Sequence, residues 1–485
     1  MGERDAILVI GAGPAGATAA RLLAQWGHAV RLVTRPPREG RRAAGLAESL
    51  TPSCGKFFDL LGIRPEIDAA GFVRATGNTV WWQPGEARVE MFADGGRGWQ
   101  VTSTALEQVM LAAAGAAGVV VERRRVTMDE ATALPAAFRL DCSGRAGVLA
   151  RDRAGRVYEP GHRTVALSAV WARDDGWPVP DPTHTLLEAY GDGWAWSVPL
   201  DGARRVVAVM VDPGTSEMNR GEGAAAAYAA EVAKTRHLAE LLARARRLDD
   251  PVGWDASMYC ATQYAGDDWL VVGDAASFVD PLSSAGVKKA LASGWLAAIV
   301  THTAITRPTM AAVARRFYAD REAEMYRGYL ALTRRYLREA ATGHERPFWA
   351  QHAEGGAGEA AASGAGPDVA AVRAAHDRLR AAPVLQVRRG EAVRVEPRPA
   401  IAGREIVLEP RLVTAAVPAG VRFEHDIDLV ALIELAPLHR QVPDLYDAYV
   451  RRTGPIGLPA FLTALSGVLA RGWLRWDTAV TDEIG

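Results

Sequence analysis

Apolar and amphipathic stretches alternate along the first part of the chain. The run Ala6–Ile10 is continuously apolar, as in a strand buried on both faces of a parallel sheet. An alanine-rich stretch typical of a helix follows it, and a second, mostly apolar run covers Ala29–Val33. The order strand, helix, strand predicts a βαβ unit and hence an α/β fold with a parallel sheet.

The middle of the chain has a different pattern. Between about 162 and 256, apolar and polar residues alternate in short stretches, most clearly over 164–171, 194–199 and 205–211. A period of two is typical of strands buried on one face, so these stretches predict an antiparallel sheet. A continuous apolar run at 269–272 then precedes a long helical stretch. The antiparallel sheet is therefore predicted to be inserted into the α/β fold.

The last part of the chain begins with a segment of unusual composition. Residues 351–367 are rich in Gly and Ala and contain no Val, Leu or Ile, so they predict a linker. Strand-like and helical patterns follow, in the order 391–396, 405–408, 428–435, 443–450, 459–470 and 473–476. This order predicts a small α+β module over 368–485 that resembles a winged helix. The net charge is −1 and no basic recognition helix is visible, so protein contact is favoured over nucleic-acid contact.

A glycine motif, G-A-G-P-A-G, follows the first strand. Gly11 permits a tight turn, Gly13 lets the backbone approach a pyrophosphate, and Gly16 lets helix and sheet pack closely. The positive end of the following helix would hold the anion. Because a strand precedes the motif and a helix follows it, the motif predicts a dinucleotide site that includes Ala12 and Ala15.

The second strand ends in Thr34, which is followed by Arg35. Proteins that bind NAD usually carry an acid here, which holds the ribose, so the departure weakens an NAD interpretation. Arg35 would suit a ribose that bears a phosphate. Both residues are candidate cofactor contacts.

A second motif lies about 260 residues downstream, where Gly273 and Asp274 end an apolar strand and Gly286 begins a long helix. It resembles the second flavin fingerprint of the glutathione-reductase-type, aromatic-hydroxylase-like flavoproteins. The resemblance implies that the Asp274 carboxylate accepts a hydrogen bond from a ribityl hydroxyl of FAD, and that the helix faces the isoalloxazine. The candidate FAD-binding residues are Gly11, Ala12, Gly13, Ala15, Gly16, Thr34, Arg35, Gln108, Gly273, Asp274, Pro281, Gly286 and Val287.

This resemblance sets the expected organisation. At 485 residues, two or three domains are expected. We expect a glutathione-reductase-type FAD-binding fold with an inserted antiparallel-sheet substrate domain, over about 1–350, followed by the linker and the C-terminal module. The expected FAD-binding segments are 1–75, 98–160 and 257–350, and the expected substrate-domain segments are 76–97 and 161–256.

Two further segments narrow the resemblance. Residues 47–53 are similar to the G-E-S/A-x-x-P-S segment of tryptophan halogenases and geranylgeranyl reductases, with Ala47 in place of the Gly. Residues 194–199 are similar to the W-x-W-x-I-P motif of flavin-dependent halogenases. Over about residues 5–349 the chain therefore resembles the flavin-dependent monooxygenase superfamily that contains these enzymes.

In halogenases the W-x-W-x-I-P motif keeps the substrate away from the flavin. Trp194, Trp196 and Pro199 are therefore candidate substrate-pocket residues, and a packed strand of large aromatics is an equally good interpretation. Only the resemblance therefore assigns this motif to a substrate pocket.

Halogenation in this family also requires a lysine in the strand that follows the 47–53 segment. That strand lies at 71–82 here, the lysine position falls at Asn78, and no lysine occurs between Lys56 and Lys234. Arginine is a poor substitute, because its delocalised charge is held protonated. The sequence thus favours oxygen transfer over halogenation and makes Asn78 a candidate pocket residue.

The resemblance implies chemistry by the flavin itself. Reduced FAD forms a C4a-hydroperoxide with molecular oxygen, and this species hydroxylates an electron-rich ring in a site that excludes water. Glu48, expected on a loop facing the cavity, is the candidate general acid or base, and a capping carboxylate at a helix start is an equally good interpretation. Electrons would come from NAD(P)H or from a partner flavin reductase.

The C-terminal module bears on the substrate. In the same branch, some monooxygenases hydroxylate a tryptophan of a protein precursor during tryptophylquinone formation, as in the maturation of quinohemoprotein amine dehydrogenase. The chain resembles these enzymes in its architecture and its missing lysine, so a protein or peptide substrate is expected. The alternatives are a small-molecule halogenase or hydroxylase, a geranylgeranyl-type reductase, and a non-catalytic flavin-bearing scaffold.

The cysteines and the longest apolar run bear on the compartment of the protein. The three cysteines, Cys54, Cys142 and Cys260, are far apart and odd in number, which predicts neither disulfides nor a metal site and favours the cytoplasm. The longest apolar run, 290–301, is too short to cross a bilayer and predicts a buried helix, so no membrane partner is expected.

Overall fold

The computed structural model describes residues 6–36, 46–216, 218, 223–344, 346–353, 368–382 and 384–477. The chain divides into two compact units, Met1–Ala357 and Gly358–Gly485, and each is described by itself.

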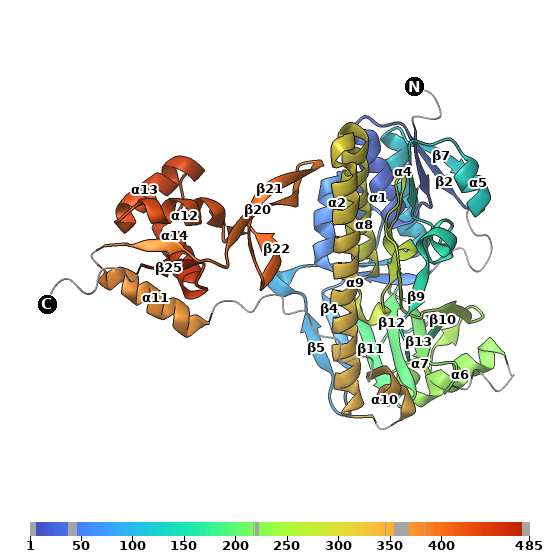
Figure 1. The fold of residues 1–485 in the computed structure, drawn as a ribbon. Coiled ribbons are helices and arrows are strands. Elements are labelled where there is room, and N and C mark those ends of the chain that lie inside the picture. The colour runs from blue at the N-terminus through green and yellow to red at the C-terminus, as the bar shows by residue number, and fades with distance from the viewer. Residues whose placement is uncertain are drawn as a thin grey trace. The chain divides into compact units, whose positions relative to one another are not determined.

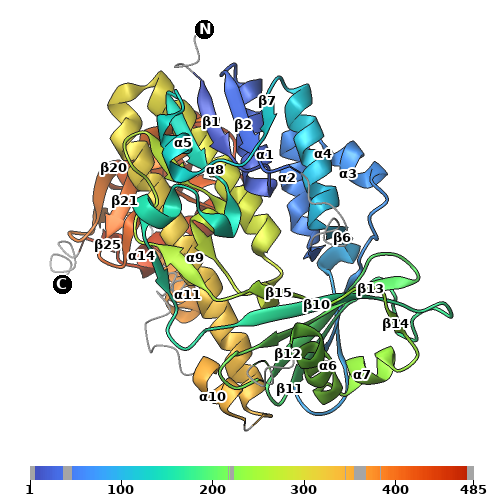
Figure 2. The same cartoon turned by 90° about the vertical axis from the view of Figure 1, so that its right-hand side faces the viewer.

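A five-stranded parallel sheet forms the first half of the larger unit (Figures 1 and 2). Its strand order is β17-β8-β1-β2-β7, with bounds Trp269–Val271, Phe138–Asp141, Ile7–Ile10, Val30–Thr34 and Val120–Arg123. All four residues of β1 are buried, as expected for a central strand with helices on both faces. The helices around it are α1 Pro14–Gln25, α4 Ser103–Ala116, α5 Met128–Ala133 and α8 Gly286–Thr306. The predicted α/β class is confirmed, and three distant parts of the sequence build this one sheet.

A second sheet of eight strands forms the other half of this unit. Its order is β14-β10-β13-β12-β11-β4-β5, and β15 also pairs with β10. The bounds are β4 Gly77–Trp81, β5 Arg88–Met91, β10 Val165–Ala172, β11 Thr185–Tyr190, β12 Gly193–Pro199, β13 Arg204–Val211, β14 Arg246–Arg247 and β15 Val252–Asp255. Every neighbouring pair is antiparallel except β4 and β11, which agrees with the predicted antiparallel insertion.

The two faces of this sheet have different covers. One face packs around Val207 and Val209 beneath α6 (Ala224–Lys234) and α7 (His237–Leu242), the pair of helices beside the sheet in Figure 2. The opposite face carries Trp194, which packs in one cluster with Leu282. Because Leu282 belongs to the loop after the Gly-Asp motif, this second face of the sheet is turned toward the candidate cofactor site.

Shorter elements join the two sheets. They are β3 Ala47–Leu50, α2 Gly55–Leu61, α3 Arg64–Ala69, β6 Trp99–Thr102, β9 Arg156–Tyr158, β16 Tyr259–Ala261 and β18 Ser277–Phe278. The long helix α9 (Ala311–Ala341) runs beside both halves in Figure 1 and leads to α10 (Pro347–Ala353). The first three residues of the predicted linker, 351–353, therefore lie in α10, where the His352 side chain is buried. The rest of that segment lies outside the described residues.

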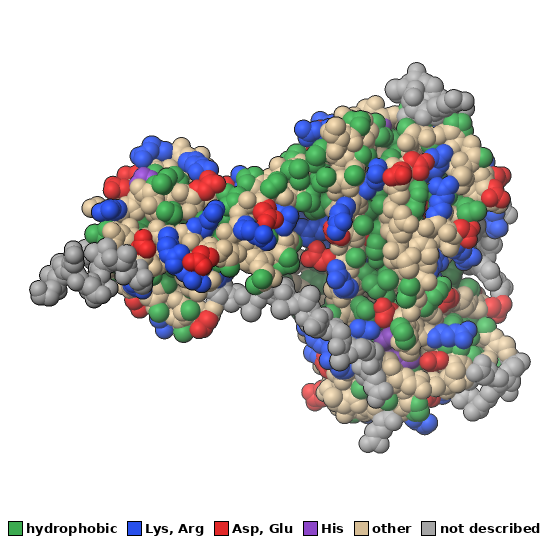
Figure 3. Space-filling model, in the orientation of Figure 1, with side chains coloured by type: hydrophobic (Ala, Val, Ile, Leu, Met, Phe, Trp, Pro, Cys, Tyr) green, Lys and Arg blue, Asp and Glu red, His purple; other side chains and the backbone are tan. Residues whose placement is uncertain are grey.

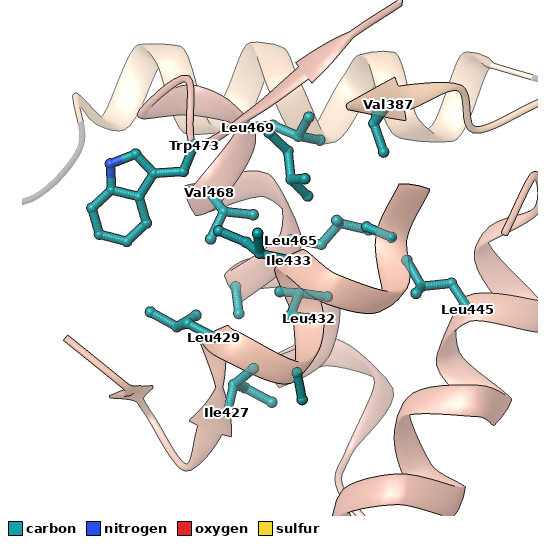
Figure 4. Close-up of a cluster of buried hydrophobic side chains, with 14 of the residues drawn as sticks. Val387, Ile427, Leu429, Leu432, Ile433, Leu445, Leu465, Val468, Leu469 and Trp473 are labelled. Atoms are coloured by element: carbon teal, nitrogen blue, oxygen red, sulfur yellow. The ribbon is translucent and has the colours of Figure 1, made fainter. Parts of the chain in front are cut away.

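The smaller unit has a core of its own. Its elements are α11 Val369–Ala381, β19 Val387–Arg389, β20 Arg394–Ala402, β21 Glu405–Thr414, β22 Val417–Val421, β23 Phe423–Glu424, β24 Ile427–Asp428, α12 Leu429–Leu435, α13 Val442–Thr453, α14 Leu458–Ala470 and β25 Leu474–Trp476. Leu432, Leu445, Leu465 and Leu469 meet in its centre (Figure 4). The three predicted helices and the last strand are present, and the predicted winged-helix arrangement stays a prediction.

Two surface properties bear on partners. On the face seen in Figure 3, basic and acidic side chains alternate over the smaller unit. Within the described ranges, no single helix is long and apolar enough to span a membrane, and only α13 and α14 together, bent by 105°, meet that test by length and composition.

Candidate functional site

The first glycine motif forms the turn between β1 and α1. Gly11 has a φ of +106°, and a Cβ there would lie 2.3 Å from the Cys142 carbonyl oxygen, so only glycine fits. A Cβ on Gly16 would lie 1.9 Å from the Gly11 carbonyl oxygen. Asp141 fixes the neighbouring turn, because its carboxylate accepts hydrogen bonds from the Ser143 and Leu149 amides at 3.0 and 2.7 Å.

The second motif packs directly against the first. Gly273 has a φ of +64°, and a Cβ there would lie 2.9 Å from the Ala15 Cβ. Gly294 of α8 is equally close, since its Cβ would lie 2.3 Å from the Ala15 carbonyl oxygen. The Gly273 amide donates a hydrogen bond to Ser293 Oγ at 2.8 Å. Helices α1 and α8 therefore meet at Ala15, which brings together two motifs that lie about 260 residues apart.

Open space remains where a dinucleotide would lie. A Cβ on Gly13 or on Gly286 would meet no atom within 4 Å, in contrast to Gly11 and Gly16. Among the described residues, no side chain caps the start of α1 or of α8, so the amides at both helix starts are available to a ligand. Two helix starts with room in front of them fit a cofactor that carries a pyrophosphate at one end and an electron-accepting ring at the other.

Two residues hold Asp274 on its buried side. The Lys289 Nζ lies 3.3 Å from its Oδ1, and its main-chain oxygen accepts a hydrogen bond from the Tyr259 hydroxyl at 2.5 Å. The Asp274 side chain is 34% exposed, which leaves carboxylate surface free to accept a hydrogen bond. Sequence reasoning missed Lys289. The only signal for it is the Lys288-Lys289 pair, which is half of the lysines of the chain.

Glu48 lies on β3, which pairs with β6, and not on a loop or at a helix start. Burial, and secondarily the negative charge of Asp274, raise the pKa of Glu48 to about 7. Its neighbour Ala47 packs against Val198 of the second sheet. Glu48 thus belongs to a strand between the FAD-binding half and the substrate sheet, and its pKa suits proton transfer near neutral pH.

The other predicted cofactor residues differ in their exposure. Ala12 is buried, Thr34 is buried at the end of β2, and Arg35 is exposed beyond it. Gln108 is exposed on α4. Pro281 and Val287, on the loop into α8 and on its first turn, are partly exposed. Ser284, between these two, adopts the left-handed conformation with φ +47°, which is uncommon for a residue with a side chain.

The predicted pocket residues all belong to the second sheet. Trp194 is 1% exposed and packs against Trp82, with ring centroids 6.3 Å apart. Trp196 is partly exposed, lies 5.1 Å from Trp194 and contacts the clusters that contain Leu282 and Ala47. Pro199 is buried, and Asn78 is partly exposed on β4. Of these residues, Trp196 has the clearest place between the substrate sheet and the cofactor loop.

The four lysines of the chain lie outside the substrate sheet. Lys56 is exposed on α2, and Lys234 binds Asp192 and Glu231 at 2.8 and 3.0 Å. Lys234 lies on α6, which covers the face of the sheet that is turned away from the cofactor loop. Lys288 and Lys289 lie in the first turn of α8. In the part of the chain that the structure describes, no lysine therefore lies on the substrate sheet.

Sequence comparison assigns the family. Residues 97–363 match the tryptophan halogenase family, and residues 4–146 match the FAD-binding domain family. The chain belongs to the tryptophan halogenase family. Members are FAD-dependent oxidoreductases, so FAD is the cofactor.

Individual relatives agree with this assignment. The flavin-dependent halogenase armH5 of Armillaria mellea is 27% identical over 346 residues, which cover 61% of this chain and 64% of that protein. The match thus spans less than two thirds of the relative. The structure of CmlS, a flavin-dependent halogenase, superposes with a TM-score of 0.74 at 19% identity, covering 97% of this chain and 95% of that one. The peptidyl tryptophan dihydroxylase QhpG, essential for tryptophylquinone cofactor biogenesis, has a TM-score of 0.67 at 25% identity, covering 93% and 99%.

Proposed function

We propose that this flavoprotein hydroxylates an electron-rich aromatic ring, and that the ring is a tryptophan side chain of a protein or peptide precursor. The observation that carries the proposal is the lysine position. Asn78 stands where halogenases need a lysine, and in the described residues no lysine lies on the substrate sheet. Without that lysine, oxidising power formed at the flavin has no amine to carry halogen to the substrate.

Each part of the site has a task in this reaction. Bound, reduced FAD supplies the activation of molecular oxygen. The start of α1 binds the pyrophosphate, Asp274 accepts a hydrogen bond from the ribityl chain, and the start of α8 favours negative charge on the ring. Trp196 and its neighbours exclude water from the reacting centre. Glu48 holds or releases a proton at its carboxyl group, because its pKa lies near 7.

The protein substrate rests on two supports. The chain is 25% identical to QhpG, a peptidyl tryptophan dihydroxylase, over 93% of its length, against 19% to the halogenase CmlS, which also spans the smaller unit. That unit exposes large apolar side chains, with Phe423 and Leu438 at 54% and 74% exposure. In this proposal, these two side chains contact the protein substrate. Electrons would come from a separate flavin reductase in the cytoplasm, or from NAD(P)H.

Mass spectrometry tests the reaction. The FAD-loaded protein is reduced, mixed with a tryptophan-containing precursor or with free indoles and phenols, and exposed to air with and without bromide. A gain of one or two oxygen atoms on a peptide tryptophan supports the proposal. Turnover of free aromatics alone would replace the protein substrate by a small molecule, and saturation of a double bond without oxygen would contradict oxygen transfer.

Halogenation of a small aromatic is the second candidate, because the chain belongs to the tryptophan halogenase family. A bromide-dependent product in the same assay would favour it. The matched variant Asn78→Lys sharpens the choice, since it restores the family's lysine on β4. Halogenated product from Asn78→Lys alone would show that the missing lysine sets the reaction of the native chain.

A further inference from the structure

Lys289 is a buried cation in an unfavourable place. It is the fourth residue of α8, and its side chain is 0% exposed. A positive charge near a helix N-terminus opposes the helix dipole, and a buried ammonium group is strongly destabilising unless partners of opposite charge and hydrogen-bond acceptors surround it. The position of Lys289 therefore needs a compensating interaction.

One carboxylate and one carbonyl contact Lys289, and a second buried carboxyl group acts on it through its charge. The Lys289 Nζ lies 3.3 Å from Asp274 Oδ1 and donates a hydrogen bond to the Ser277 carbonyl oxygen at 2.5 Å. Glu322, on α9, is also fully buried. Burial raises the pKa of Glu322 to about 7, and the positive charge of Lys289 opposes that rise. Of the two carboxyl groups, only that of Asp274 belongs to the cofactor site.

Asp274 is fixed on its inner side and open on its outer side. Lys289 binds one carboxylate oxygen, and the Tyr259 hydroxyl binds the main-chain oxygen. Yet a third of the Asp274 side chain stays exposed, at 34%. This arrangement is typical of a ligand-binding group that a second residue orients.

We infer that Lys289 is a positioning residue of the FAD site, which anchors the carboxylate of Asp274 from behind and leaves its free surface to accept the ribityl hydroxyl. The inference rests on the FAD assignment and is independent of whether the enzyme hydroxylates or halogenates. Lys288 offers a matched comparison, because it carries the same charge one residue earlier and is partly exposed.

The test is titration of the apoprotein with FAD, followed by flavin fluorescence. Lys289→Met should raise the dissociation constant of FAD by about tenfold or more, the loss expected for one charge-assisted hydrogen bond. Lys288→Met removes the same charge and should change the constant by no more than about twofold. Equal losses in the two variants would mean that only net charge matters, which would overturn the inference.

Two further variants separate positioning from folding. In an Asp274→Asn background, Lys289→Met should weaken FAD binding by no more than about twofold, because Lys289 acts through Asp274. The same full loss in that background would contradict the inference. The pair Lys289→Met with Glu322→Met replaces two buried charged groups by apolar side chains, which proteins often tolerate. It should melt like the native apoprotein and still bind FAD as weakly as Lys289→Met, whereas native affinity would trace the loss to an unpaired Glu322.

This outcome is independent of the proposed reaction. FAD affinity reports on Lys289, and the mass of the aromatic product reports on the reaction, so either can fail while the other stands.

Discussion

The two halves of the larger unit hold their functional residues in different ways. In the FAD-binding half, the glycines Gly11, Gly16, Gly273 and Gly294 allow close approach to neighbouring residues, and Asp274 is the functional side chain. In the substrate sheet, large side chains such as Trp194 fill the space between layers. A local motif can encode the turns at Gly11 and Gly273, since each of these glycines acts on its own backbone. The packing in the substrate sheet depends on neighbours that are distant in sequence.

Replacement of Trp194 by alanine should have the largest effect on stability. Trp194 is 1% exposed, and truncation of a buried Trp leaves a cavity and costs about 3 to 5 kcal/mol. Urea unfolding of the apoprotein measures the loss. Trp196→Ala is the matched control in the same strand, and because Trp196 is partly exposed its loss should be clearly smaller. Equal losses would show that Trp196 contributes as much packing as Trp194, despite its partial exposure.

In the FAD-binding half, Gly16→Ala and Gly13→Ala should behave oppositely. A Cβ on Gly16 would lie 1.9 Å from a backbone oxygen, so the overpacked variant should lose about 3 kcal/mol of unfolding free energy. A Cβ on Gly13 would meet no atom within 4 Å, so its apoprotein should stay within about 0.5 kcal/mol of the native one. Gly13→Ala should nevertheless weaken FAD binding, because the Cβ enters the space of the pyrophosphate. Native FAD affinity in Gly13→Ala would place the pyrophosphate elsewhere.

The same contrast explains how much of the molecule could be predicted from its sequence. Strand, turn and helix around Gly11 follow from local pattern, as does the Gly273 turn, so the α/β fold and the two glycine turns were predictable. The packing of α8 on α1 through Gly294 could not be predicted, because no residue near Gly294 in the sequence indicates that it contacts Ala15. Lys289 was missed for a related reason. The side chain of a lysine at the start of an apolar helix is normally exposed to solvent. Only the folded chain brings Asp274 close to the Lys289 Nζ.

Site residues on the substrate sheet were harder to place. Trp194 and Trp196 both pack in the cluster that contains Leu282, yet Trp194 is 1% exposed and Trp196 is partly exposed. Glu48 was expected on a loop or at a helix start and lies on a strand, because its partner strand β6 comes about 50 residues later. Pairing over that distance leaves no periodic signal in a segment of four residues.

His162, which lies just before β10 of the substrate sheet, should make the free energy of unfolding depend on pH. It is 2% exposed and lines a cavity of about 540 Å³. Burial, and to a lesser degree the charges of His352 and Arg334, lower its pKa to about 4. The unfolded chain, with an ordinary histidine pKa of about 6.5, binds more protons between these two values, so stability falls as the pH drops from 7 toward 4, by about 2 to 3 kcal/mol.

Urea unfolding at pH 7 and pH 5 measures this loss. His162→Gln should show a flatter dependence on pH than the native protein. His376, whose side chain is 38% exposed, provides the control, and His376→Gln should follow the native curve. Parallel curves for native protein and His162→Gln would contradict the assignment.

Glu48 should give the opposite dependence on pH, and the smallest effect. Its folded pKa of about 7 lies above the ordinary value of 4.5, so the carboxyl stabilises the fold at low pH, and this contribution is lost as the pH rises through 7. Because Glu48 keeps some exposure, we expect Glu48→Gln to stabilise the apoprotein by only about 1 kcal/mol at pH 8 and to leave it unchanged at pH 5. The same variant should lower turnover if the carboxyl moves a proton in the reaction. A gain in stability together with a loss of turnover would show that the strand between the two halves keeps an unfavourable acid for its chemistry. Equal stability of native protein and Glu48→Gln at pH 8 would mean that the carboxyl is solvated like an ordinary surface acid, and the contrast between the two halves would then rest on their packing only.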